Sequence, residues 1–236
     1  MKLLKPILLV CFALLSTLGF YAALSYFERQ KPPPHPIKAI AQTGPIKEAL
    51  KTSCLAEILG LSEDLPLSIT AEEAKEILQK TSLIKRVSVD LLNPETLYID
   101  YTLRAPQFIL GDVENLAIDK HDVVFPLSPY HTPKRLPILY MGEGNHKLKK
   151  YIATHLLELL GEEVTMIDVS KCVEKSLGSR EIVVAHGPHL LRLTPKNYEE
   201  ELAQYKRLCA TLGREPLIID LRVPKLAFVK PRSATY

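Results

Sequence analysis

The chain has 236 residues, of which 47% are hydrophobic and 24% are charged, and its formal net charge is +3. This composition is typical of a folded protein with one large or two ordinary domains, and it excludes a disordered chain. The small net charge and the lack of a dense basic run argue against a nucleic-acid partner.

The first 36 residues predict a membrane anchor followed by a spacer. Residues 1–6 form a short tail, and the segment from Ile7 to Phe27 contains no charged residue. Its length matches the ~20 apolar residues that a helix needs to span a bilayer. The proline-rich residues 28–36 predict an extended linker. We therefore expect a single-pass inner-membrane protein with a cytoplasmic N-terminus and exported, periplasmic domains.

Two alternatives to an anchor fit the same segment. Ala23-Leu24-Ser25 is a small-x-small site at which a signal peptide could be cleaved. A lipoprotein signal around Cys11 fits less well, because no small residues precede that cysteine. The apolar residues continue through Phe27, beyond the usual apolar core of a signal peptide, and this length favours the uncleaved anchor.

Residues 37–106 predict a small domain with the element order β-α-α-β-β. A strand is expected over 37–43, and a helix over 50–59 that ends at Gly60. Thr70 and Glu73 have the spacing of a capping box, which predicts the start of a second helix. The alternating residues of 84–106, interrupted by Asn93-Pro94, then predict a β-hairpin.

Residues 107–230 predict a larger mixed α+β domain with an extended, mostly antiparallel sheet. Strands are expected at 115–118, 123–127, 136–140, 164–169, 181–185, 189–193, 216–221 and 225–229. A helix is expected over 146–160, and its buried stripe is expected to contain Leu148, Tyr151, Ile152, His155, Leu156, Leu159 and Leu160. Lys147, Lys149 and Lys150 are expected on a solvated helix face. A second helix is expected from residue 194 to 213, and residues 231–236 are expected to be a disordered tail.

The sequence contains no recognisable catalytic or metal-binding constellation. The seven histidines are scattered without metal-ligand spacing, and no glycine-rich phosphate loop is present. Cys54, Cys172 and Cys209 match no zinc or redox motif. We therefore expect no enzyme activity, no cofactor, no metal and no small-molecule substrate.

Six motifs in consistent order resemble the bacterial cell-division family FtsQ, which is called DivIB in Gram-positive bacteria. They are Ser82–Val89, Asn93–Ile99, Leu103–Pro106, Leu116–Asp119 with Val123–Phe125, Leu136–Tyr140 and Ile219–Arg222. The family has one membrane span, a POTRA domain and a β domain. The resemblance implies the same organisation here, with Arg104, Ala105 and Pro106 as the interdomain hinge. Asp122 and Val223 depart from the family's usual glycine and aromatic residue.

The resemblance implies an assembly protein of the division machinery. Family members hold FtsB and FtsL and help to recruit the septal peptidoglycan synthase (FtsW/FtsI), and the partner docks at the carboxy-terminal strand. The corresponding residues here are Arg222, Val223, Pro224, Lys225, Leu226, Ala227, Phe228 and Val229. An edge strand suits this role, because its unpaired N–H and C=O groups accept a partner strand. Leu226 and Phe228 are expected on one face, and Lys225 and Ala227 on the other.

Several alternatives stay open at this point. Phe228 could pack in the protein's own core, and Asp220 and Arg222 could form an ordinary structural ion pair. Residues 93–106 are a candidate second contact surface for other division proteins. From other classes, the sequence is compatible with a membrane-anchored cell-envelope enzyme or a POTRA-containing translocation component.

Overall fold

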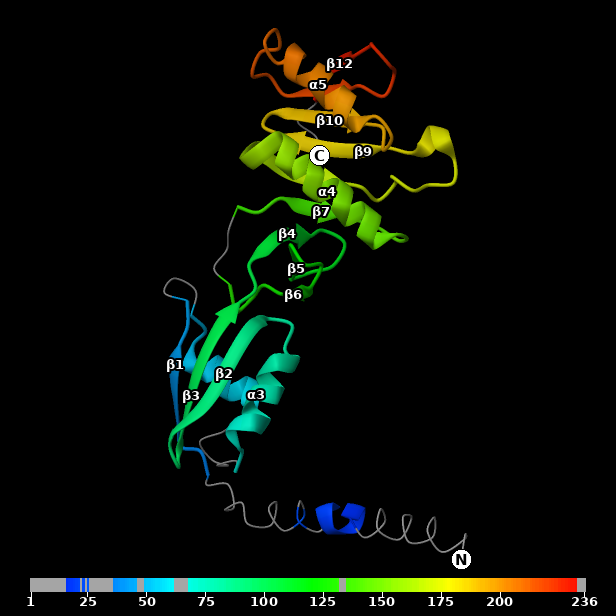
Figure 1. Cartoon of the computed structure of the whole chain (residues 1–236). Coiled ribbons are helices and arrows are strands. Elements are labelled where there is room, and N and C mark those ends of the chain that lie inside the picture. Colours follow the sequence, from blue (N-terminus) through cyan, green and yellow to red (C-terminus); the bar gives the residue numbers. More distant parts are fainter. Residues whose placement is uncertain are drawn as a thin grey trace, which may run out of the picture.

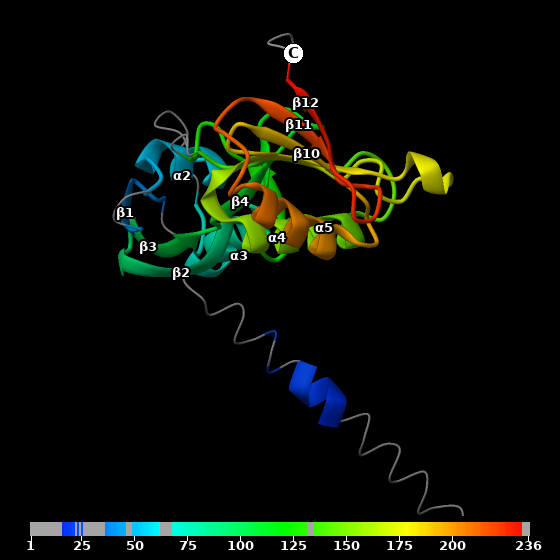
Figure 2. The ribbon, with the colours of Figure 1, turned by 90° about the horizontal axis from the view of Figure 1, so that it is seen from above.

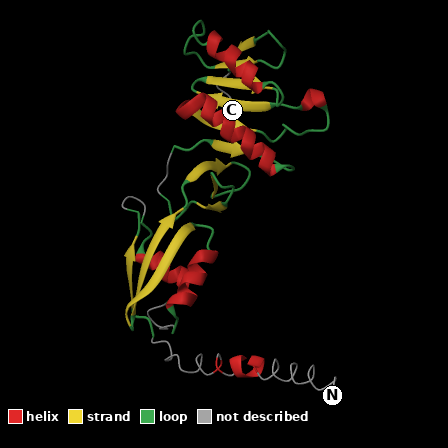
Figure 3. Cartoon of the chain, viewed as in Figure 1, coloured by secondary structure: helices red, strands yellow, loops and turns green. Residues whose placement is uncertain are grey.

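The chain folds into two sheets, each packed against its own helices (Figure 1). The structure, a computed structural model, describes residues 16–21, 23, 25, 36–45, 49–61, 68–131 and 135–232. Its class is mixed α+β, and the elements alternate along the chain (Figure 3). The three-stranded sheet ends at Leu103, and the nine-stranded sheet begins at Pro106.

The structure corrects the prediction of a membrane-spanning helix. Among the described residues, no helix is both long and apolar enough to cross a bilayer. Of the predicted span from Ile7 to Phe27, only residues 16–21, 23 and 25 are described, and the rest lies outside the described residues. Because a span needs about 20 continuous apolar residues, the predicted single-pass inner-membrane localisation, with periplasmic domains, is corrected on the same finding.

The first unit is a three-stranded sheet with two helices. Its elements are β1 (Ala39–Thr43), α2 (Thr52–Leu59), α3 (Ala71–Lys80), β2 (Ile84–Asn93) and β3 (Thr96–Leu103). β3 is central, parallel to β1 and antiparallel to β2. The predicted capping box of α3 is confirmed, because Thr70 Oγ1 accepts from Glu73 N–H and the Glu73 carboxylate accepts from Thr70 N–H. These reciprocal bonds satisfy two N–H groups that a bare helix end leaves unpaired.

The hairpin of β2 and β3 is confirmed, and its buried face supplies much of the first core. Leu97, Ile99 and Tyr101 of β3 are buried against α2 and α3. The Asn93 side chain accepts a hydrogen bond from Glu95 N–H, which closes the turn. At the tip, Leu91 lies opposite the buried Leu97 but is itself 51% exposed.

The second unit is a nine-stranded sheet in the order β12-β11-β10-β9-β8-β7-β4-β5-β6. Its strands are β4 (Pro106–Leu110), β5 (Leu116–Asp119), β6 (Val124–Pro126), β7 (Ile138–Tyr140), β8 (Val164–Asp168), β9 (Ile182–His186), β10 (His189–Leu193), β11 (Leu217–Asp220) and β12 (Phe228–Pro231). The pairs β4–β7, β7–β8 and β10–β11 are parallel, and the other pairs are antiparallel.

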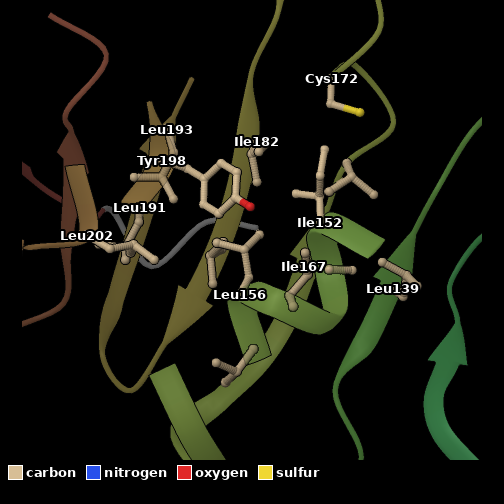
Figure 4. Close-up of a cluster of buried hydrophobic side chains, with 14 of the residues drawn as sticks. Leu139, Ile152, Leu156, Ile167, Cys172, Ile182, Leu191, Leu193, Tyr198 and Leu202 are labelled. Carbon is tan, nitrogen blue, oxygen red and sulfur yellow. The ribbon is translucent and has the colours of Figure 1, made fainter. Parts of the chain in front are cut away.

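Two helices, α4 (His146–Leu160) and α5 (Tyr198–Leu208), lie on the same side of this sheet (Figure 2). Beneath them, Leu139 of β7, Ile167 of β8 and Leu191 of β10 are fully buried. Ile152 and Leu156 of α4 pack onto this row (Figure 4). Burial alternates along β10, where His189, Leu191 and Leu193 are buried and the residues between them are partly exposed, as expected for a sheet covered by helices on one face (Figure 2).

Helix α4 has the predicted limits, and Ile152 and Leu156 of its predicted stripe are buried, but the first part of the stripe is not. Leu148 is 42% exposed and Tyr151 is 66% exposed, whereas Lys149 and Lys150 are buried. The ammonium group of Lys149 donates to the carbonyl oxygens of Met141, Glu143 and Ser170 at 2.6, 2.5 and 2.9 Å. A buried ammonium is tolerated only when its three donors are satisfied, and here backbone carbonyls from two loops satisfy them.

The two units share a contact surface near their junction. Phe125 of β6 and Ala117 of β5 belong to the second sheet, but their side chains are buried in the core of the first unit. The far end of the nine-stranded sheet therefore packs against the three-stranded unit. This contact couples the two units through apolar burial as well as through the linker at residues 104–106.

Candidate functional site

The last strand, β12, forms one edge of the nine-stranded sheet. It pairs antiparallel with β11, from Asp220 opposite Phe228 to Leu217 opposite Pro231. No described strand pairs with its other side. The predicted strand at 225–229 is therefore displaced toward the C-terminus. Pro231, expected in a disordered tail, belongs to the strand, and residues 233–236 lie outside the described residues.

The displacement has a local cause in the segment that precedes β12. Lys225 has a φ of 63°, in the left-handed region, and so cannot continue an extended strand. Leu226 N–H donates to the carbonyl oxygen of Val223 at 3.1 Å, which closes a turn. Lys225 and Leu226 therefore lie in the turn, and the expected alternation of strand faces does not extend to them.

The register identifies the backbone groups that face away from β11. Arg232 N–H donates to Pro216 O at 2.9 Å, so residues 216 and 232 form a hydrogen-bonded pair. In an antiparallel ladder, such pairs alternate with pairs whose backbone groups point outward. Val229 and Pro231 occupy these alternate positions. The N–H and C=O of Val229 are thus open to a further strand, whereas Pro231 offers only a carbonyl.

The side chains around this edge are apolar and exposed. Phe228 is 59% exposed, Leu226 53%, Val229 44% and Val223 43%. Phe228 therefore does not pack in the protein's own core. Ala227, by contrast, packs against the second core. Phe228 lies opposite Asp220 on the sheet face away from the helices, because the neighbouring Ile219 is buried beneath them.

An ion-pair network flanks the edge on the same face. Arg222 donates to both carboxylate oxygens of Asp220, at 2.9 and 2.7 Å. Arg192, on the next strand, donates to Glu181 at 2.5 Å and lies 3.3 Å from Asp220. Arg222 and Lys171 each lie 3.4 Å from Glu181. The pair of Asp220 and Arg222 is thus one part of a larger network at the end of β11.

The network sets the ionisation of both carboxylates. The hydrogen bonds from Arg222 hold the pKa of Asp220 below its ordinary value. Burial raises the pKa of Glu181, but the hydrogen bond and charge of Arg192, with the charge of Arg222, outweigh it and give a net lowering. Both groups are therefore ionised at neutral pH.

The segment that contains β12 also carries only basic charged residues. Between residues 222 and 232 there are four basic residues and no acidic one: Arg222, Lys225, Lys230 and Arg232. The sequence-based site included the first two of these basic residues and omitted Lys230 and Arg232. The proline at 231 was a signal for an edge strand, because a proline in a sheet is confined to edges, strand starts and bulges.

The predicted hinge residues lie where the two sheets meet. Arg104 and Ala105 connect β3 to β4, and Pro106 is the first residue of β4. Arg104 N–H donates to Leu83 O, and its side chain forms an ion pair with Asp119 at 2.9 Å. The hinge residues therefore do not meet the edge at β12, which is at the opposite end of the nine-stranded sheet.

Among the described residues, no group of His, Cys, Asp and Glu is placed to hold a metal ion, and Cys54, Cys172 and Cys209 are free. No protein-family model matches the chain, and no curated protein matches it. The fold and the edge thus define a two-unit α+β protein with an open, basic sheet edge. The FtsQ/DivIB resemblance stays a prediction from the motifs.

Proposed function

We propose that this chain is a non-catalytic assembly protein of bacterial cell division that binds an FtsB- or FtsL-like partner by strand addition at β12. The observation that carries the proposal is the open side of β12, where the backbone groups of Val229 point outward. The six FtsQ-like motifs supply the choice of partner. Through that partner the chain would act on the septal peptidoglycan synthase.

Strand addition at this edge has a physical rationale. A partner strand would satisfy the free N–H and C=O of Val229, and its side chains would cover exposed apolar groups such as Phe228 and Leu226. The edge is short, because Pro231 offers no N–H and the turn at Lys225 ends the strand on the other side. Backbone pairing is therefore limited to a few residues, and the side chains must supply the rest of the affinity.

The basic character of the edge indicates the charge of the partner. Arg222 is paired with Asp220, but Lys225, Lys230 and Arg232 add three further cations with no acid between residues 222 and 232. A partner strand flanked by Asp or Glu is therefore favoured and a basic one is repelled. Exposed charges of this kind act mainly on the association rate and are screened by salt. We therefore expect capture to weaken as ionic strength rises.

The test uses a proline that removes one outward N–H. Val229→Pro deletes the free donor and leaves the hydrogen bonds to β11 intact, because Val229 does not donate to β11. Val229→Ala is the matched control, since it shortens the side chain and keeps the N–H. With the full chain and purified FtsB-like partner, we expect Val229→Pro to weaken capture at least tenfold and Val229→Ala by less than threefold.

Thermal unfolding of both variants separates binding from folding. The proposal requires that Val229→Pro melts as cooperatively as the parent chain. Unchanged capture by a folded Val229→Pro chain would refute strand addition at β12. A second variant, Phe228→Asp combined with Lys225→Glu, inverts the apolar and basic character of the edge and is expected to abolish capture in the same assay.

A further inference from the structure

Two surface cavities adjoin the linker between the two units. The first, of about 330 Å³, lies between the end of α3 and the start of β2 and is lined by Gln79, Ile84, Lys85, Arg86, Val87 and Arg104. The second, of about 280 Å³, is lined in part by Lys85, Pro106, Asp119, Lys120 and His121. Lys85 lines both cavities, so they adjoin each other. The first cavity has three cationic lining residues and no acidic one.

A strand irregularity places Lys85 at this point. The register passes from Ile84 opposite Leu103 to Arg86 opposite Thr102, so Lys85 has no residue opposite it in β3. Such a bulge redirects side chains and is frequent beside binding sites. Within the described part of the chain, neither Lys85 nor Arg86 forms an ion pair. Both side chains are exposed, and their charges are available to a ligand.

Arg104 adds a third cation, and only part of its guanidinium group is hydrogen-bonded. Its Nη1 donates to Asp119 Oδ2 at 2.9 Å, which fixes the side chain. Its Nε is buried and has no hydrogen-bond partner among the described residues. The Nε and Nη2 edge of a guanidinium is the fork that binds a carboxylate or phosphate with two hydrogen bonds. Here Nη1 is used by Asp119 and Nε is buried, so Arg104 contributes to the cavity mainly through its charge.

We propose that the first cavity binds a phosphoryl group, either as inorganic phosphate or on a small phosphorylated molecule. Asp119 neutralises Arg104, and the two unpaired cations Lys85 and Arg86 then match the two negative charges of a phosphate monoester. The cavity is larger than a phosphate group, so it has room for a small organic substituent, with Lys120 and His121 of the adjoining cavity beside it. This site does not depend on the partner edge at β12.

Calorimetric titration of the full chain at fixed ionic strength tests the proposal. The probes are inorganic phosphate and glycerol phosphate, with sodium chloride as the reference. We expect saturable one-to-one binding of both phosphates and none of chloride. Tighter binding of glycerol phosphate would identify the ligand as a phosphorylated molecule, and equal binding would identify the free anion. Binding of neither phosphate would overturn the proposal.

Variants locate the site. Lys85→Gln with Arg86→Gln is expected to weaken phosphate binding at least tenfold without a change in melting, because both residues are exposed. The matched control is Lys80→Gln, on the last turn of α3, since Lys80 lines neither cavity. An equal loss of binding in Lys80→Gln would show a diffuse charge effect and refute the site. In the parent chain, excess inorganic phosphate must displace glycerol phosphate, and failure to compete would contradict a single shared site.

Discussion

Arg104 and Asp119 form an ion pair with 2.9 Å between Nη1 and Oδ2, and it joins the linker after β3 to the last residue of β5. The side chain of Asp119 is only 4% exposed and that of Arg104 19%. Asp119 also accepts from the backbone N–H groups of His121 and Val123. One carboxylate thus fixes the turn between β5 and β6 and the course of the chain between the two units.

Removal of Arg104 should lower the stability of the folded chain, because it leaves the Asp119 carboxylate buried without its cation. For Arg104→Ala we expect the free energy of unfolding to fall by about 3 kcal/mol, measured by urea denaturation. The control is Lys38→Ala, which removes the exposed ion pair with Glu95 and should cost under about 1 kcal/mol. Equal costs for the two variants would show that burial does not strengthen the dependence on Arg104.

Phe125 should couple the unfolding of the two units, since its side chain lies in the core of the first unit while its backbone belongs to the second sheet. Phe125→Ala is expected to lower the free energy of unfolding by about 3–5 kcal/mol and to separate one melting transition into two. Calorimetry detects the separation. Val124→Ala, on the same strand and 39% exposed, is the control and should leave the transition nearly unchanged. A single unaltered transition in Phe125→Ala would contradict coupling through this contact.

Lys149 should contribute to stability despite its charge. Lys149→Met keeps the volume of the side chain but leaves three carbonyl oxygens without a donor. We expect a loss of about 2–4 kcal/mol in denaturant unfolding. Lys147→Met removes an exposed lysine from the same helix and should change stability by less than about 0.5 kcal/mol. A neutral Lys149→Met would show that these carbonyls find water or other donors.

Acid should destabilise the protein through the ion-pair network beside β12. The pKa values of Asp220 and Glu181 are lowered in the folded chain, so the unfolded chain binds protons more readily. This contribution to stability is complete above the ordinary pKa values of about 3.9 and 4.3, and it is lost as the pH falls through the lowered ones. Unfolding free energies measured between pH 6 and pH 2 should therefore decrease toward low pH.

Asp220→Asn with Glu181→Gln should flatten this decrease, because neither side chain can then take up a proton. Glu57→Gln, an exposed residue of α2, controls for the loss of a negative charge and should keep the slope of the parent chain. A slope in the double variant as steep as that of the parent would assign the acid sensitivity to other carboxylates. Glu201 does not contribute to the acid sensitivity, because burial raises its pKa in the folded chain. Protonation of Glu201 at low pH therefore favours the folded state.

The local elements of the fold could be predicted from the sequence because short-range interactions decide them. The capping box of Thr70 and Glu73, the limits of α4 between Asn145 and Gly161, and the hairpin turn at Asn93 depend on bonds within a few residues. The prediction of a membrane span from Ile7 to Phe27 was based on the length of the apolar segment. It was wrong, because no described helix is long and apolar enough to cross a bilayer.

Three features depended on contacts between distant parts of the chain. Lys149 is buried because loops at residues 141–143 and 170 supply carbonyl oxygens to its ammonium group. The periodicity of the helix sequence does not predict these contacts. Phe125 lies in the first core because one end of the large sheet packs there. The sequence determined that residues near 228 are extended, but only the order of the strands decided that β12 lies at the edge, since pairing across a sheet is fixed by the whole fold.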